Sequence, residues 1–382
     1  MFPKLRFKEF DGDWLKLKYK DVLTIKYGKD HKSLNDGDIP VYGTGGLMRH
    51  VNKYLYDGES ILIGRKGTID KPKYINEKFW TVDTLFYTEI EESIVPLFLY
   101  QHALEVNWLG LNEATGVPSL NTTSIYNIDI SIPSKEEQTK IASFLSNVDE
   151  KISQLTQKLE LLSQYKQGMM QKLFSQQIRF KADDGSEFGE WGEYKIFDLA
   201  IDKTLNNGVF NDQNKVGKGY KLINVLDMYI QRDIDESRLS LLDIDKKEFE
   251  RNKVNYGDIF FTRSSLVKEG IAFSNVYLGV SNDITYDGHL IKLSPDLNII
   301  EPKFLNYCLK VAYVRKQLIQ GGKTATMTTI GQQEVGNTLV KIPCLEEQIR
   351  IANFLSAIDQ KIDVVSKQIE QAKQWKKGLL QQ

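Results

Sequence analysis

Apolar residues recur in alternating steps of three and four along two segments of the chain. In the first segment these positions are Ile141, Leu145, Val148, Ile152, Leu155, Leu159 and Leu162, and in the second they are Ile351, Leu355, Ile358, Ile362, Val365 and Ile369. A mean spacing of about 3.5 residues over several heptads is typical of a coiled-coil seam rather than of an ordinary surface helix. The pattern therefore predicts two long helices, each of which needs a partner along its apolar stripe.

These two helical segments are copies of one sequence. Residues 132–152 and 342–362 are identical at 13 of 21 positions without a gap, at a constant offset of 210 residues. Upstream the match is fainter, but Gly12-Asp13-Trp14 corresponds to Gly189-Glu190-Trp191. The chain is therefore an internal duplication, in which a divergent globular unit precedes each copy of a well-preserved helix.

The start of each helix can be located from its capping residues. Ser134 precedes Glu137 by three residues, which is the spacing of a capping box. The second copy has Cys344 in place of the serine, so we expect that helix to begin less firmly, by about 1 kcal/mol. We expect a first head at 1–133, a helix at 134–177, a second head at 178–343 and a second helix at 344–382.

The two heads have the pattern of mixed structure with short strands. Runs rich in β-branched and aromatic residues, bounded by Gly, Asp and Asn, predict strands at 22–27, 39–42, 60–63, 80–87, 220–225, 259–262, 271–276 and 290–293. Proline is favoured in a first helical turn, so short helices are expected after Pro96 and Pro302. The expected fold class is α+β, with two mixed α/β heads separated by two long helices.

Chain topology favours an antiparallel pairing of the two helices over a parallel one. A second head of about 165 residues separates the helices, and an antiparallel pair would place the heads at opposite ends. That arrangement has an approximate two-fold axis. We therefore expect a pseudo-two-fold molecule held by an antiparallel coiled coil.

Composition narrows the class of protein only a little. The hydrophobic content of 41% and the charged content of 26% are ordinary for a soluble globular protein, and the net charge is −1. No apolar run approaches the ~20 residues that span a bilayer, and the amino terminus has no apolar stretch of the secretory kind. Two cysteines, Cys308 and Cys344, cannot form a disulfide framework, so a cytoplasmic location is expected.

Charge is distributed unevenly along the first head. Residues 14–75 carry 12 Lys and Arg against 7 Asp and Glu, whereas residues 76–133 carry 1 against 8. Ordinary surface variation explains this contrast as well as a basic face turned towards phosphate groups does.

The repeated motif Pro-x-x-Glu-Glu-Gln-x-x-Ile-Ala-x-Phe-Leu-x-x-x-Asp-x-Lys-Ile, at 133–152 and 343–362, resembles the conserved regions of Type I restriction-modification specificity subunits (HsdS). The resemblance includes the Gly-x-Trp opening of each head and covers essentially the whole chain. It implies an antiparallel coiled coil with a target-recognition domain at each end, and a bipartite double-stranded DNA target. It also implies assembly with two methyltransferase subunits, and with restriction subunits when DNA is cleaved.

Several signals of enzymatic chemistry fail on inspection. Gly321-Gly322-Lys323-Thr324 resembles a phosphate loop, but Gln317 stands where the first glycine is required. Gly43-Thr44-Gly45-Gly46 lacks the third glycine of a dinucleotide turn. Asp296 with Glu301-Pro302-Lys303 mimics a nuclease metal site, yet proline does not fit the central strand that such a site needs.

Other catalytic patterns are missing as well. None of the nine prolines is adjacent to another, so the Pro-Pro box of an adenine methyltransferase is absent, and the four histidines have no zinc spacing. We therefore expect no catalytic site, no metal and no cofactor on this chain. By the family resemblance, S-adenosylmethionine belongs to the methyltransferase subunits and ATP with Mg to the restriction subunits.

Candidate DNA-binding residues in the first head lie in loops that present cations, amides and hydroxyls. Arg and Lys suit guanine, Asn and Gln suit adenine, and Lys, Ser and Thr suit phosphate. The loop 64–68 follows a predicted strand and holds two cations between glycines, which would let the backbone approach DNA, although a solvated turn explains the pattern equally well. The candidates are Thr44, Arg49, Arg65, Lys66, Thr68, Asn112, Thr115 and Ser119.

The second head offers a matching set. Arg263-Ser264-Ser265 has the same place after a predicted strand, and the segment 323–329 aligns with 113–119 through the offset of the repeat. Lys215 and Lys218 lie in the glycine-flanked loop before Tyr220. The candidates are Lys215, Lys218, Arg263, Ser264, Ser265, Lys323, Thr324, Thr326 and Thr328.

Three functions are compatible with this sequence to different degrees. A two-headed DNA reader explains both the duplication and the divergence of the heads. A coiled-coil interaction scaffold that does not read DNA explains the helices alone. A single-chain nuclease or methylase lacks its motifs.

Overall fold

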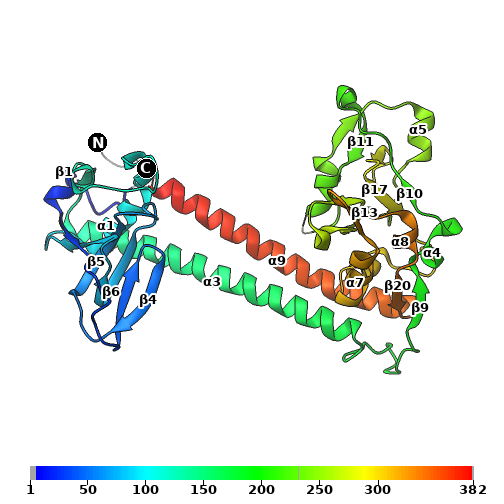
Figure 1. The fold of residues 1–382 in the computed structure, drawn as a ribbon, viewed down its shortest axis with the longest axis horizontal. Helices are drawn as coiled ribbons and strands as arrows, with labels where there is room; N and C mark the ends of the chain where they lie inside the picture. The colour runs from blue at the N-terminus through cyan, green and yellow to red at the C-terminus, as the bar shows by residue number, and fades with distance from the viewer. Residues whose placement is uncertain (1–5, 231, 381–382) are drawn as a thin grey trace. The chain divides into compact units, whose positions relative to one another are not determined.

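The computed structural model describes residues 6–230 and 232–380 (Figure 1). The chain divides into two compact units, and each is described by itself. Unit 1 comprises residues up to Gln157 together with those from Ser366 onward, and unit 2 comprises Lys158–Val365. The helices α3 (Lys135–Phe174) and α9 (Leu345–Leu380) contribute to both units, so each unit contains one head and parts of both helices.

Unit 1 is built on a six-stranded sheet with the order β2-β7-β5-β6-β3-β4. Its strands are β2 (Leu23–Tyr27), β3 (Ile39–Gly43), β4 (Gly46–Val51), β5 (Tyr56–Gly64), β6 (Lys73–Thr81) and β7 (Leu85–Ile90). The run Ile61-Leu62-Ile63 in β5 is buried on both faces of the sheet. Ile61 and Ile63 belong to the cluster that includes α1 (Pro96–Glu105), and Leu62 packs with Phe79, Leu85 and Tyr87 of the neighbouring strands. The main core of the unit therefore lies between β5 and α1.

Smaller elements complete unit 1. They are β1 (Leu15–Lys18), β8 (Asp129–Ile132) and the one-turn helix α2 (Thr122–Tyr126). Strand β1 pairs antiparallel with β8, and Leu15 faces Ile132 in this register. Because β8 leads directly into α3, the β1–β8 pair joins the head to its helix.

Unit 2 repeats this plan with a smaller sheet. The order β10-β17-β13-β15 is formed by β10 (Asn206–Asn207), β13 (Ile259–Thr262), β15 (Ser274–Val276) and β17 (Leu290–Leu293). Strands β9 (Gly192–Lys195) and β20 (Leu339–Ile342) pair as β1 and β8 do. A second sheet, β12-β11-β16, contains β11 (Val216–Ile223), β12 (Ser240–Leu242) and β16 (Ile284–Tyr286).

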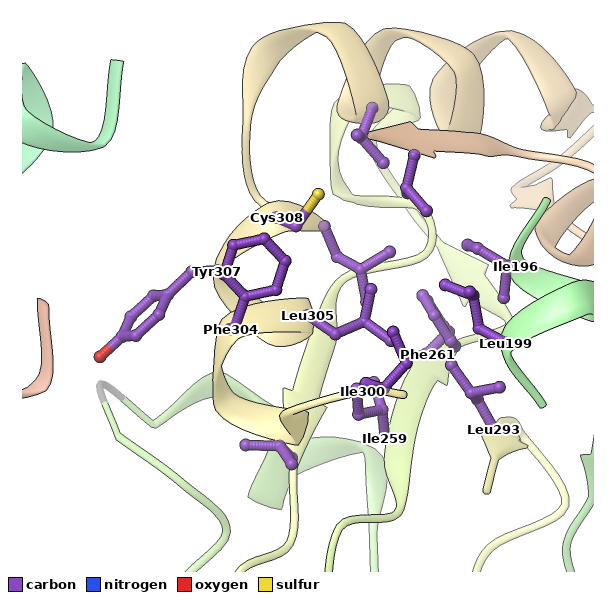
Figure 2. Close-up of a cluster of buried hydrophobic side chains, with 14 of the residues drawn as sticks. Ile196, Leu199, Ile259, Phe261, Leu293, Ile300, Phe304, Leu305, Tyr307 and Cys308 are labelled. Atoms are coloured by element: carbon purple, nitrogen blue, oxygen red, sulfur yellow. The ribbon is translucent and has the colours of Figure 1, made fainter. Parts of the chain in front are cut away.

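The core of unit 2 lies between β13 and the helix α6 (Pro302–Cys308). Figure 2 shows Phe304 and Leu305 of α6 facing Ile259 and Phe261 of β13. Four further helices belong to this unit: α4 (Ile196–Leu199), α5 (Lys246–Arg251), α7 (Ala312–Gly321) and α8 (Gln332–Gly336). Ile196 and Leu199 of α4 complete the same cluster.

Most of the predicted strands and helices are present, and two strand predictions are wrong in part. The expected strand 80–87 is two strands, since β6 ends at Thr81 and the amide of Leu85 bonds to the carbonyl of Val82 in a tight turn. The expected strand 271–276 is confined to Ser274–Val276, because Ala272 has a positive φ of 49° that no strand adopts. The helices expected after Pro96 and Pro302 are confirmed.

The Glu-Glu-Gln motif fastens each head to its helix in the same way. Glu137 is buried and accepts two hydrogen bonds of 2.7 Å from the guanidinium of Arg6. Glu347, the matching residue of the second copy, accepts hydrogen bonds of 3.1 and 2.7 Å from Arg179. Each arginine also donates to a carbonyl in the Gly-x-Trp opening, that of Gly12 or Gly189.

The glutamine of the motif has an equally specific role. The side chain of Gln138 accepts from the amide of Val95 and donates to the carbonyls of Ser93 and Pro133. Gln348 makes the matching three bonds in unit 2, to the amide of Glu301 and the carbonyls of Ile299 and Pro343. These internal contacts explain why the motif is preserved while the rest of each head diverges.

The capping prediction is right for Ser134 and wrong for Glu137. Ser134 Oγ accepts a hydrogen bond from the amide of Glu137 at 3.3 Å. The reciprocal half of a capping box is missing, because the Glu137 carboxylate is taken by Arg6. At the second helix Cys344 is exposed, and the carboxylate of Glu347 likewise accepts hydrogen bonds from Arg179.

Within each unit the two long helices touch through an ion pair. In unit 1, Lys376 Nζ lies 2.8 Å from Asp149 Oδ1, and in unit 2, Lys166 Nζ lies 2.6 Å from Asp359 Oδ1. The two aspartates occupy the same position of the repeat, as do the two lysines, so the pairs are copies of one contact. Since α3 begins in unit 1 and ends in unit 2, whereas α9 does the opposite, the touching segments come from opposite ends of the helices.

The predicted seam positions behave as the heptad pattern requires. Every one of these side chains, from Ile141 to Leu162 and from Ile351 to Ile369, is buried or half-buried. The residues around the seam are mostly polar or charged and exposed, as Lys158, Glu160, Glu370 and Lys373 are, whereas Leu161 is an exposed apolar residue.

Candidate nucleic-acid interface

In the first head, the structure brings together two loops that lie far apart in the sequence. Arg65 follows the last residue of β5, and the next residue, Lys66, forms a β-bridge with Ser119. The amide of Gly67 bonds to the carbonyl of Pro118 at 2.8 Å, and the amide of Leu120 bonds to the carbonyl of Arg65 at 2.9 Å. The candidate segments 64–68 and 112–121 therefore form one surface, joined by this bridge, which is called the ribbon of the first head.

The second head contains the same pairing. Arg263 follows the last residue of β13, and β14 (Ser264–Ser265) pairs antiparallel with β19 (Thr328–Thr329). The amide of Ile330 bonds to the carbonyl of Arg263 at 3.0 Å, as Leu120 does to Arg65. Strand β18 (Lys323–Thr324) adds a third strand to this ribbon.

The backbone amides of the two arginines also make equivalent hydrogen bonds. The amide of Arg65 bonds to the carbonyl of Thr84, and the amide of Arg263 bonds to the carbonyl of His289, each at 2.9 Å. Both side chains are exposed. The guanidinium of Arg65 lies over the ring of Tyr27, 5.7 Å from its centroid, and donates to the carbonyl of Asp83.

Glycine shapes the first loop for an internal reason. A Cβ on Gly64 would lie 2.1 Å from the carbonyl oxygen of Thr68, so only glycine lets the loop fold back on itself. Whether the loop glycines also let the backbone approach DNA stays a prediction. A Cβ on Gly67 would lie 3.4 Å from Thr44 Oγ1, which places the turn between β3 and β4 beside the loop.

Two candidates of the first head have structural partners. Arg49 forms an ion pair with Asp36 at 2.8 Å and donates to the carbonyl of Leu34. Asn112 accepts hydrogen bonds from the amides of Ala114 and Ser119, so its side chain organises the loop. Both contacts explain these residues without a ligand, whereas Lys66 and Thr115 are exposed and Thr68 and Ser119 are half-exposed on the same surface.

The second head has a hollow of about 470 Å³ beside its ribbon. Arg263, Ser264, Lys323 and Thr329 line it. The hollow also holds His289, which no sequence pattern selects, because its role depends on β17 lying next to Arg263. The ring of His289 is held by a 2.7 Å contact from Nδ1 to Asp287.

A carboxylate balances the cations of this hollow. Lys323 Nζ lies 3.2 Å from Glu334 Oε1, and the side chain of Lys323 is 83% exposed. The pKa of Glu334 is lowered first by a hydrogen bond from the backbone amide of Glu334 itself, and then by the neighbouring Lys323. The hollow therefore presents hydrogen-bond donors and one charged hydrogen-bond acceptor. The edges of base pairs also carry both donors and acceptors, so the two sets could match.

One candidate of the second head, Thr328, needs correction. Thr328 is 1% exposed and its hydroxyl bonds to that of Thr324 at 2.9 Å, so it holds the ribbon together and faces inward. Lys215 ends the short helix 213–215 and Lys218 lies in β11, so both are outside the ribbon. Lys218 pairs with Asp243 at 2.9 Å, and both lysines are exposed and stay predictions. Ser265 is half-exposed on the ribbon, and Thr324 and Thr326 remain exposed there.

The sites that only mimic enzyme chemistry have ordinary structural roles. Glu301 caps α6 through the amide of Phe304, and Asp296 accepts from the amide of Asn298 in a turn. Across residues 6–230 and 232–380, no group of His, Cys, Asp and Glu is arranged to hold a metal ion. In the same ranges no helix is long and apolar enough to cross a membrane.

Residues 11–164 and 189–374 match the family described as Type I restriction modification DNA specificity domain. The chain belongs to this family. The two matched ranges contain the two ribbons, so each head of this specificity subunit is one copy of the family's DNA specificity domain.

Curated relatives agree with this assignment. The Type I restriction enzyme MjaVIII specificity subunit of Methanocaldococcus jannaschii is 25% identical over 341 residues, covering 85% of this chain and 76% of that protein. The Type I restriction enzyme EcoBI specificity subunit of Escherichia coli is 22% identical over 397 residues, covering 94% and 82%.

A solved structure has the same fold. The S subunit of a Type I restriction-modification system from M. genitalium is similar with a TM-score of 0.67 at 15% identity, covering 100% of this chain and 98% of that one. A second structure, described as showing complex assembly and conformational transition of the type I R-M system, has a TM-score of 0.55 at 14% identity and covers 97% of each chain. The specificity subunit therefore has the family's fold along its whole length.

Proposed function

We propose that this specificity subunit reads a bipartite double-stranded DNA sequence, one half-site with each head, for a Type I restriction-modification complex. The observation that carries the proposal is the duplicated ribbon. Each ribbon begins with an exposed arginine, Arg65 or Arg263, at the end of an equivalent strand. The side chains around the two arginines differ, so two unlike half-sites are expected.

The helices would serve as the ruler between the half-sites. At about 1.5 Å per residue, a helix of about 40 residues is about 60 Å long. Two antiparallel helices that contact through repeated ion pairs would hold the heads at a fixed separation. The spacer between the half-sites would then be fixed in length but not in sequence.

The repeat also supports two copies of one partner. Tyr165 of α3 and Trp375 of α9 occupy the same position of the repeat, and their side chains are 51% and 52% exposed. Exposed aromatic residues of this kind are enriched at protein interfaces. Two equivalent surfaces would bind two methyltransferase subunits, and restriction subunits would join when the complex cleaves DNA.

The chemistry would then be carried by the partners. We propose that S-adenosylmethionine binds to the methyltransferase subunits and that ATP and Mg bind to the restriction subunits, while this chain supplies the sequence preference. The buried carboxylates that would otherwise suggest catalysis, such as Glu137 and Glu347, are used to fasten the heads.

The test is to co-express the chain with a methyltransferase subunit in a host without other adenine methylation, and to map methylated adenines across the genome. The expected result is one motif with two unlike halves and a spacer of constant length. A chain that only gathers partners would give no motif, and a motif in one continuous block would contradict the two-headed assignment.

A further inference from the structure

The ribbon of the second head ends in an apolar tip. Leu266 follows Ser265 at the end of β14, and Ser265 lies opposite Thr328 in β19. Met327 precedes Thr328, so Leu266 and Met327 lie at the same end of the ribbon. The side chains of Leu266, Val267 and Met327 are 86%, 62% and 40% exposed.

Polar contacts hold this tip in one conformation. Ser265 Oγ donates to the carbonyl of Val267 at 2.7 Å and accepts from the amide of Val267 at 3.3 Å. The amide of Gly270 bonds to the carbonyl of Val267 at 3.1 Å.

The base of the same loop is clamped by a single guanidinium. Arg315 of α7 donates to the carbonyls of Glu269, Ile271 and Ala272 at 2.7–2.8 Å. The apolar side chains are therefore exposed on a braced turn, a preorganised arrangement that favours binding because little freedom is lost on contact.

The rest of the ribbon suggests what the tip meets. The exposed side chains of Arg263 and Lys323 lie at the base of the same ribbon, where Ser264 and Lys323 both pair with Thr329. Glu334 balances the charge of Lys323, and the guanidinium of Arg263 stays exposed. The major groove of DNA, about 12 Å wide, admits a two-stranded ribbon, such as the hairpin of β18 and β19 whose turn contains Met327. Base pairs show hydrogen-bonding groups there and one apolar group, the 5-methyl of thymine.

We propose that Leu266, with Met327 beside it, contacts thymine methyl groups, so that the half-site of the second head contains at least one A·T pair read through its methyl. This inference rests on the proposed DNA-reading function. It names one chemical group, a thymine methyl, in one half of the DNA target.

The first head has only part of this feature. Lys66 bridges Ser119 as Ser264 pairs with Thr329, so Thr68 stands where Leu266 does, and Val117, 56% exposed, stands where Met327 does. The first tip is therefore polar at the Leu266 position alone. The methyl dependence assigned to Leu266 belongs to one half-site only.

The experiment uses the full chain in complex with its methyltransferase subunits and a duplex that carries the mapped motif. Each thymine of the motif is replaced in turn by deoxyuridine, which removes only the methyl group, and the Kd is measured at fixed salt. Burial of one methyl group predicts binding that is about fourfold weaker at the thymine that Leu266 contacts.

Two variants make the assignment specific. Leu266→Ala should bind the unmodified duplex more weakly and should lose the response to deoxyuridine at that one thymine. Leu226→Ala is the matched control, because Leu226 is 82% exposed in the same head but lies in the short helix 225–229, outside the ribbon. It should keep the fourfold response.

Two outcomes would overturn the inference: equal binding of thymine and deoxyuridine duplexes throughout, or an unchanged response in Leu266→Ala. Equal binding of intact and scrambled motifs would instead overturn the proposed function itself. The two failures are therefore distinguishable in one set of titrations.

Discussion

Replacement of Arg179 tests whether the repeated motif fastens head to helix. The Arg179 guanidinium makes two hydrogen bonds to Glu347 and one to the carbonyl of Gly189. The Glu347 side chain is 0% exposed and that of Arg179 is 21% exposed. In Arg179→Ala the carboxylate stays buried without its cation.

The magnitude follows from this geometry. Breaking a buried ion pair by removing one partner costs about 3–5 kcal/mol. Because a fifth of the Arg179 side chain reaches water, we expect a smaller loss, so that the free energy of unfolding of unit 2 falls by about 2–3 kcal/mol. Adding Glu347→Gln should restore part of the loss, since the unpaired charge is then removed.

Hydrogen exchange at increasing urea concentration measures each unit separately, because peptides report where the chain opens. Peptides from β9 and β20 should open at lower urea in Arg179→Ala, while peptides from β5 and β7 should not change. Lys181→Ala is the control, since Lys181 pairs with Glu187 where both side chains are exposed. Unchanged β9 and β20 peptides, or an equal shift in both units, would refute the reasoning.

Three further predictions concern other parts of the chain. Burial lowers the pKa of His102 to about 4, so the free energy of unfolding of unit 1 should fall by up to about 3 kcal/mol as pH drops from about 6.5 to about 4, because the unfolded chain binds the proton first. His102→Gln should flatten this dependence in urea titrations, and an unchanged slope would contradict it. Gly64→Ala should weaken recognition of one half-site in DNA-binding titrations, because its Cβ would lie 2.1 Å from the Thr68 carbonyl oxygen; intact recognition would contradict this. Inserting one heptad into both α3 and α9 should change the length of the spacer in methylation maps and leave both half-sites unchanged. An unaltered spacer would contradict the proposal that the helices set its length.

The elements that depend on periodicity and duplication were predictable from the sequence. Heptad spacing located α3 and α9, and the internal repeat aligned 113–119 with 323–329, which the structure places in equivalent positions opposite Arg65 and Arg263. Such patterns are local or repeated, so one chain is enough to read them.

Features that depend on long-range packing were not predictable in the same way. The burial of Thr328 and the place of His289 arise from strand order, which no local pattern of residues specifies. The partner of Glu137 was missed for the same reason. A signal did exist, since Arg6-Phe7-Lys8 and Arg179-Phe180-Lys181 are identical triplets before the two Gly-x-Trp openings.

The central claim, that each head reads its own half-site, is tested most directly by discrimination in methylation rates. Complexes of the wild type, Arg65→Ala and Arg263→Ala are compared on duplexes altered in one half of the motif or the other. We expect each variant to lose about 1–3 kcal/mol of discrimination at one half-site, a different one for each, and to keep it at the other. Equal loss at both half-sites in either variant would contradict the claim.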